Sequence, residues 1–272
     1  MIGVESSFEN PLPIELADGL IWLGNCIPIP SREDEVKIHS GDSLFLIVGE
    51  HGCGLVESAY TYNAWDTLEQ LARLIEERDL PPIKYVFVTH SELAHAGGVG
   101  HILTKFPDPV VCGEPSDLHL IFPQFEDRFV WSNVGDRYDL GGREILIVDG
   151  VVRDMPNSRW AFDTGSKTLF TGDGFAYAHH HDEAHCGHMV EDVPELDIPD
   201  NMRSFAKGAF NFLEYIDIEP TIARLDELIE ELGVERICPT HGLPIGDPSA
   251  TMPVIREGYR RASRNVTLDL YA

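Results

Sequence analysis

Three side chains that can bind a metal ion lie close together in the sequence, directly after an apolar run. They are His90, Glu92 and His95, within the stretch Thr-His-Ser-Glu-Leu-Ala-His-Ala-Gly-Gly that begins at Thr89. Imidazole and carboxylate groups bind iron, manganese and zinc, and a tight loop can bring all three to one site. A polar loop with incidental histidines is the alternative, because short motifs also occur by chance. The choice depends on residues further along the chain.

Two more residues with metal-binding side chains, Asp173 and His241, follow strand-like runs, as His90 does. Short apolar runs bounded by turn residues are typical of strands, and the run before His90 is typical of a buried one. The three runs cover residues 84–89, 167–171 and 236–238. We therefore expect the ligands to emerge where strands end.

The rest of the chain predicts two β-rich halves with helices outside them. Further strands are expected at residues 20–23, 43–48, 54–57, 110–111, 144–148 and 159–163. Apolar residues at helical spacing predict amphipathic helices over 66–78, with Asp66 as the N-cap, and over 222–232. Two β-rich halves covered by helices indicate an α/β (α+β) fold of the αββα sandwich type. No linker divides the chain, so we treat it as one domain.

In the order of these residues the chain resembles the metallo-β-lactamase superfamily. Its usual motif is His-x-His-x-Asp-His at a strand end, followed by a third histidine, a bridging aspartate and a final histidine. Residues 170–175 and 239–242 resemble the segments that carry the last two, and Glu92 makes the motif similar to the His-x-Glu-x-Asp-His of flavodiiron proteins. The resemblance covers nearly the whole chain. It implies a metallo-β-lactamase-type αββα sandwich, with two mixed sheets and helices outside, over residues 1–272 and without a flavodoxin domain.

Two positions depart from the family pattern. Ala94 stands where the family has an aspartate, so one carboxylate ligand of the second metal is missing. Asp154 stands where ordinary members have a histidine: residues 153–158 resemble their Gly-His-Thr-Pro-Gly-Ser segment, with Pro156 and Ser158 in register. A carboxylate at this position has a parallel in the diiron hydroxylase branch of the superfamily.

The resemblance implies two metal sites that share Asp173. The first site would add three side chains to this aspartate and the second site two. They are His90, Glu92 and Asp154 in the first site, and His95 and His241 in the second. Because the first set is rich in oxygen, two iron ions are the expected cofactor, with zinc or manganese as alternatives. Ala94 leaves open a weak or empty second site.

This ligand set predicts a flavodiiron-like non-haem (di)iron protein that binds or activates dioxygen or nitric oxide. It could act as a reductase, as an oxygenase of a small organic substrate, or as a sensor. Without a flavodoxin domain, electrons would come from a separate donor, and the resemblance implies a homo-oligomer. The main alternative is a zinc-dependent hydrolase of an ester, lactone or thioester. A metal-free interaction module is a third interpretation, motivated by Ala94 and Asp154.

Histidines outside the motif have two interpretations. Residues 179–188 are rich in histidine and could supply a missing ligand or a proton relay, although a histidine-rich surface loop is the simpler interpretation. His39 is either structural or a neighbour of the metals, since flavodiiron-like proteins carry a histidine in a comparable early segment. His39 and His179 could therefore contact the metal ligands without binding a metal themselves.

The five cysteines are widely spaced and include no Cys-x-x-Cys pair. They are Cys26, Cys53, Cys112, Cys186 and Cys238. This spacing argues against a disulfide framework and against a thiolate zinc ribbon. We expect reduced thiols that lie mostly in the core.

The charge balance limits the possible partners. The chain has 46 acidic and 20 basic residues, a formal net charge of −26, which disfavours nucleic acid and anionic membranes. The longest apolar runs, such as residues 44–48, are too short to span a bilayer. The first ten residues lack the basic start and apolar stretch of a secretory signal, so a cytoplasmic location is expected.

Overall fold

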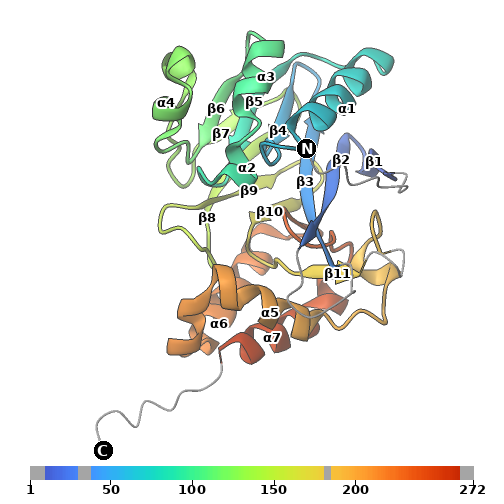
Figure 1. Cartoon of the computed structure of the whole chain (residues 1–272), viewed down its shortest axis with the longest axis vertical. Helices are drawn as coiled ribbons and strands as arrows, with labels where there is room; N and C mark the ends of the chain where they lie inside the picture. Colours follow the sequence, from blue (N-terminus) through green and yellow to red (C-terminus); the bar gives the residue numbers. More distant parts are fainter. Residues whose placement is uncertain (1–9, 30–37, 181–184, 264–272) are drawn as a thin grey trace, which may run out of the picture.

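The strands form two sheets in the computed structural model, which describes residues 10–29, 38–180 and 185–263 (Figure 1). The seven-stranded sheet contains β1 (Ile14–Ala17), β2 (Leu20–Ile29), β3 (Ile38–Val48), β4 (Cys53–Val56), β5 (Ile83–Val88) and β6 (Val110–Gly113) in that order, with β11 (Ala178–His180) paired to β3. The five-stranded sheet has the order β12 (Arg236–Pro239), β10 (Thr168–Gly172), β9 (Arg159–Asp163), β8 (Glu144–Asp149) and β7 (Arg137–Asp139).

Both sheets are mixed, as predicted. The first is antiparallel from β1 to β4, and β5 runs parallel to both β4 and β6. In the second sheet β10 is antiparallel to β9 and parallel to β12. Parallel neighbours end at the same edge of a sheet, so the residues that follow β4 and β5 lie together, as do those that follow β10 and β12.

Successive side chains along the strands of the first sheet point to opposite faces of that sheet, and each face contributes to a different hydrophobic core. One row of paired residues packs between the two sheets, together with Phe162 and Phe170 of the second sheet. This row runs through Trp22, Phe45, Val56, Phe87 and Cys112. The next row packs in the other core, against the helices outside this sheet. It runs through Ile21, Leu46, Leu55, Val86 and Val111.

Helices cover the outer face of each sheet, which confirms the metallo-β-lactamase-type αββα sandwich (Figure 1). Beside the first sheet lie α1 (Ala64–Glu77), α2 (Leu93–Ala96), α3 (Val99–Lys105) and α4 (Leu118–Ile121). Beside the second lie α5 (Ile198–Ala209), α6 (Glu219–Leu232) and α7 (Pro248–Ala262). Short 3-10 helices span Pro123–Arg128, Val190–Asp192 and Asn211–Tyr215. In the described part of the chain, no helix is both long and apolar enough to cross a bilayer.

One helix start differs from the prediction. The helix α1 begins at Ala64 and not after Asp66, with Asn63 at the N-cap position. The side chain of Asn63 does not cap the helix; its amide donates to Asp42 instead, 3.3 Å away. Asp66 lies in the first turn, where its negative charge favours the positive end of the helix dipole.

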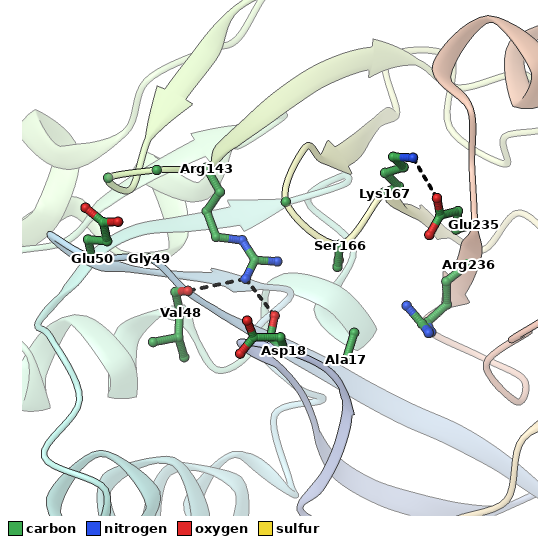
Figure 2. Close-up of a pocket in the computed structure, with 13 residues that line it drawn as sticks. Ala17, Asp18, Val48, Gly49, Glu50, Arg143, Ser166, Lys167, Glu235 and Arg236 are labelled. Atoms are coloured by element: carbon green, nitrogen blue, oxygen red, sulfur yellow. Dashed lines mark hydrogen bonds and ion pairs between the residues drawn. The ribbon is translucent and has the colours of Figure 1, made fainter.

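The side chain of Arg143 also joins the two sheets, at the side of the molecule. Arg143, which precedes β8, pairs with Asp163 at the end of β9. Its guanidinium also donates to the carbonyls of Asp18 and Val48, at 2.9 and 3.3 Å, and so reaches across to the first sheet (Figure 2). The surface pocket around it also contains the pair Lys167–Glu235. Since Arg143 is used in packing, we assign this pocket a structural role.

Candidate metal centre

Asp173 lies among three histidines that the sequence analysis selected. It follows β10, and its carboxylate oxygens lie 3.4 Å from His95 Nε2, 3.5 Å from His241 Nε2 and 3.7 Å from His90 Nε2. His90 and His95 come from the segment after β5, and His241 from the segment after β12. The parallel pairing of β10 with β12 explains why Asp173 and His241 meet.

The two remaining predicted carboxylates complete one side of this group. His90 Nε2 lies 3.5 Å from Glu92 Oε2 and 3.4 Å from Asp154 Oδ2. The side chain of Glu92 is 58% exposed and that of Asp154 is 12% exposed, whereas those of His90 and His95 are almost fully buried. The group is therefore open to solvent on the side of Glu92. Ala94, in α2 beside it, adds no carboxylate.

The buried Glu57 fixes the rings of two histidines. Thr89 Oγ1 donates to Glu57 Oε1 over 2.5 Å, so this hydroxyl must accept from His90 Nδ1, 3.0 Å away. His95 Nδ1 lies 3.3 Å from the same carboxylate oxygen. Both imidazoles therefore carry a proton on Nδ1 and direct Nε2 at Asp173.

His241 is oriented in the same way by the backbone. Its Nδ1 lies 2.6 Å from the carbonyl of Gly41, which can only accept, so Nδ1 donates. Its Nε2 is then the nitrogen directed at Asp173. All three histidines thus direct Nε2 to the same place, which is the arrangement that a metal ion needs.

Unsatisfied polar atoms at the centre support a metal site. Among the described residues, His90 Nε2, His95 Nε2 and Asp173 Oδ1 are buried and have no hydrogen-bond partner. Buried polar atoms are normally paired, so such a group points to an ion that these atoms would hold. Donor atoms of His90, Glu92, His95 and Asp173 all lie within 4.8 Å of one another. The residues present therefore fit a bound metal.

The charges of this group are strongly coupled. Burial alone would raise the pKa of Asp173, but His95, His241 and His90 hold it well below its usual range. Burial opposes a charge on His95, yet Asp173 and Glu57 hold the pKa of its imidazole well above the usual value. The pKa of Asp154 is raised by burial and by Asp173. A divalent cation would relieve this repulsion between carboxylates.

Glu57 and Thr89 are not among the site residues predicted from the sequence. Both residues directly follow strands, Glu57 after β4 and Thr89 after β5, and these strands are parallel neighbours. Their position at strand ends is the feature of the sequence that points to them. We predict that Glu57→Gln lowers metal affinity about 10- to 100-fold, because it removes the charge that holds His95 while preserving side-chain shape. Anaerobic titration calorimetry of the metal-free protein measures this. Glu50→Gln, at an exposed turn, is the matched control, and equal affinities for both variants would refute the role of Glu57.

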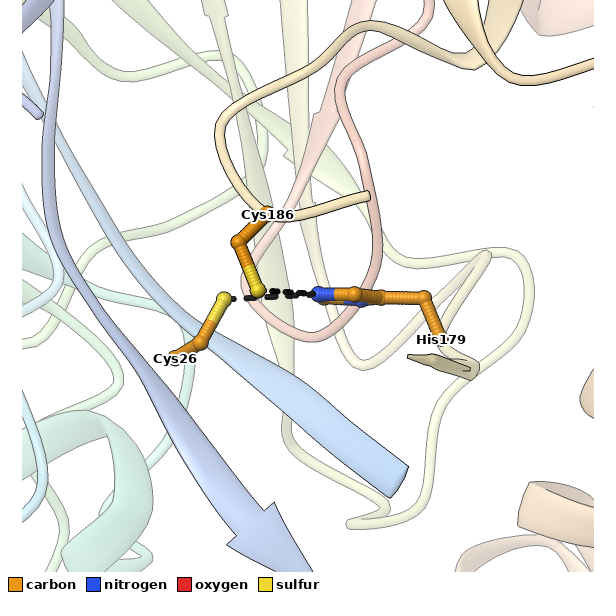
Figure 3. Close-up of side chains that lie close together, drawn as sticks. All are labelled: Cys26, His179 and Cys186. Atoms are coloured by element: carbon orange, nitrogen blue, oxygen red, sulfur yellow. Dashed lines mark hydrogen bonds between the residues drawn. The ribbon is translucent and has the colours of Figure 1, made fainter. Parts of the chain in front are cut away.

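The two further histidines lie in paired strands. His39 of β3 is opposite His179 of β11, with ring centroids 6.4 Å apart. His179 Nε2 lies 3.4 Å from the sulfur atoms of both Cys26 and Cys186 (Figure 3). His179 and His185 are buried, so a surface loop is the wrong interpretation for them. Residues 181–184 of this segment lie outside the described ranges.

Known proteins resemble the chain in sequence and in structure. It is 22% identical over 249 residues to the coenzyme F420H(2) oxidase of Methanothermobacter marburgensis, covering 86% of this chain and 58% of that protein. Rubredoxin oxygen:oxidoreductase from Desulfovibrio gigas superposes with a TM-score of 0.72 and 17% identity, over 92% of this chain and 61% of the other. The chain thus spans about three fifths of the length of these two proteins.

A third similar structure is matched over nearly its whole length. It is a peroxy diiron species of the chemotaxis sensor ODP, with a TM-score of 0.63 and 16% identity, over 90% of this chain and 99% of the other. At these identities the two structures establish the fold. The model of the metallo-beta-lactamase superfamily matches residues 41–241, which contain all six candidate ligands. The chain therefore belongs to the metallo-beta-lactamase superfamily.

Proposed function

We propose that this chain holds a non-haem diiron centre that reacts with dioxygen or nitric oxide. The observation that carries the proposal is the convergence of three histidine Nε2 atoms on Asp173, two of them buried without a hydrogen-bond partner among the described residues. The names of the relatives support it: one is an oxidase, one an oxygen:oxidoreductase and one a diiron sensor. These activities belong to those proteins, and we extend only the shared chemistry to this chain.

Each metal would be held by a different set of side chains. We assign His90, Glu92 and Asp154 to one metal and His95 and His241 to the other, with Asp173 shared. The first set contains more carboxylate than imidazole, which favours iron or manganese over zinc. The second has only two histidines and the shared carboxylate because Ala94 offers no ligand, so a position is left for a small molecule.

The residues of the chain prepare this centre in three ways. Glu57 and the Gly41 carbonyl occupy Nδ1 of His95 and His241, so that Nε2 is the nitrogen left to bind a metal. The buried histidines restrict water, while the exposed Glu92 leaves an entry for a diatomic molecule. Bound iron would supply the electrons that reduce dioxygen or nitric oxide. A separate donor must return those electrons, and we keep a homo-oligomer as a prediction.

Metal analysis tests the proposal directly. Protein made in iron-supplemented medium and purified without a histidine tag or added metal should contain about two irons per chain and absorb in the near ultraviolet. After anaerobic reduction, dioxygen or nitric oxide should change this spectrum. Stoichiometric zinc, no chromophore and turnover of activated esters would refute the proposal in favour of the hydrolase.

A further inference from the structure

A second group of metal-binding side chains lies outside the candidate metal centre. Cys26 comes from β2, His179 from β11 and Cys186 from the segment after residue 184. The side chains point at one another, and His179 Nε2 lies 3.4 Å from each sulfur (Figure 3). All three donor atoms lie within 4.8 Å of one another. His179 and Cys186 are 1% and 6% exposed, so the group is largely shielded from water.

These distances fit a tetrahedral zinc site. Zinc binds sulfur at about 2.3 Å and imidazole nitrogen at about 2.0–2.1 Å, so neighbouring sulfur and nitrogen ligands are about 3.5 Å apart across a tetrahedron. The two distances from His179 Nε2 to sulfur are both 3.4 Å. A further nitrogen, His39 Nδ1, lies 3.8 Å from Cys186 Sγ. Two cysteines and two histidines form a common ligand set of structural zinc sites.

We propose that Cys26, His179 and Cys186 bind a zinc ion, and that His39, which lies outside this group of three but contacts Cys186, turns toward the ion as its fourth ligand. On binding, the two thiol S–H bonds break, two sulfur–zinc bonds form and two protons pass to solvent, with no change of oxidation state. Thiolate ligands favour zinc, whereas carboxylate-rich sites favour harder ions such as iron. The ion of the sulfur site would therefore differ from those of the candidate metal centre. The proposal stands independently of the proposed function.

The site would stabilise the strand that supports His241. His39 lies in β3 two residues before Gly41, whose carbonyl accepts from His241 Nδ1. The zinc would cross-link β2, β3 and β11, since its ligands come from all three strands and from Cys186. Its role is therefore structural: it holds the end of β3 in place beside the candidate metal centre.

Cobalt substitution distinguishes the two sites. The candidate metal centre has only nitrogen and oxygen donors, so only the sulfur site can give thiolate-to-cobalt charge transfer in the near ultraviolet. Metal-free full-length protein, kept reduced and anaerobic, should gain this band on titration with Co²⁺. Cys26→Ser and Cys186→Ser should lose it. Cys53→Ser, which retains the hydrogen bond to the Pro81 carbonyl, should keep it and is the matched control.

Three further variants guard against misfolding and against confusion with the other centre. His179→Cys supplies a third thiolate and should keep the band, whereas His179→Ala should lose it. Asp173→Asn should keep the band while it impairs the candidate metal centre. Zinc analysis should show about one ion fewer per chain in Cys26→Ser than in the wild type. Absence of the band in the wild type, or a Cys26–Cys186 disulfide in peptide maps of anaerobically purified protein, would overturn the proposal.

Discussion

Asp173→Asn is expected to abolish metal binding at both candidate sites and, with it, the reaction with dioxygen. Asp173 lies within 3.7 Å of the Nε2 atoms of His90, His95 and His241, and burial makes its charge costly without a cation. An amide keeps the shape and removes the charge. We expect metal affinity to fall more than about 100-fold, because loss of an outer partner alone costs about 10- to 100-fold. Metal content and dioxygen uptake by the reduced protein measure the effect.

A surface aspartate gives the control for this substitution. Asp149, at the end of β8, forms an exposed ion pair with Arg153, and Asp149→Asn should leave metal content and dioxygen uptake unchanged. Circular dichroism of both variants verifies that the fold is retained. If folded Asp173→Asn still holds two irons per chain, Asp173 is not the shared ligand and the assignment of both sites is wrong.

The candidate metal centre could be predicted because its residues stand directly after strands. A short apolar run before His90, Asp173 or His241 is visible in the sequence, and parallel pairing then brings two such ends together. Glu57 also directly follows a strand. Its role depends on contacts with Thr89 and His95, which only the assembled sheet provides.

The sulfur group could not be predicted because its members are distant in the sequence. Cys26 and His179 are 153 positions apart, and their contact depends on the pairing of β11 and β2 with β3. No local spacing marks such a site. The helix α5 is not predicted from the sequence for a different reason. Its start is marked only by Asp197, whose side chain accepts from the backbone N–H of Asp200, and by the proline in its first turn. Both are weak signals without an apolar run.

The double substitution Glu92→His and Asp154→His should change the metal preference of the first site from iron to zinc. Both carboxylates lie within 3.5 Å of His90 Nε2, and replacing them leaves imidazoles around the shared Asp173. Imidazole-rich tetrahedral sets suit zinc, whereas carboxylates suit harder, redox-active ions. Glu92 is exposed and can accommodate a ring without loss of packing.

We expect iron to fall from about two to below about one per chain, zinc to rise by about one above the wild-type content, and the visible chromophore and dioxygen uptake to disappear. The matched control adds histidines elsewhere: Asp66→His with Glu230→His, on the exposed faces of α1 and α6, should leave the metal content as it was. The three original histidines keep their Nδ1 partners, so we expect the double variant still to bind metal. Retention of two irons would mean that Glu92 and Asp154 do not determine the choice of metal, and that the histidine geometry alone does.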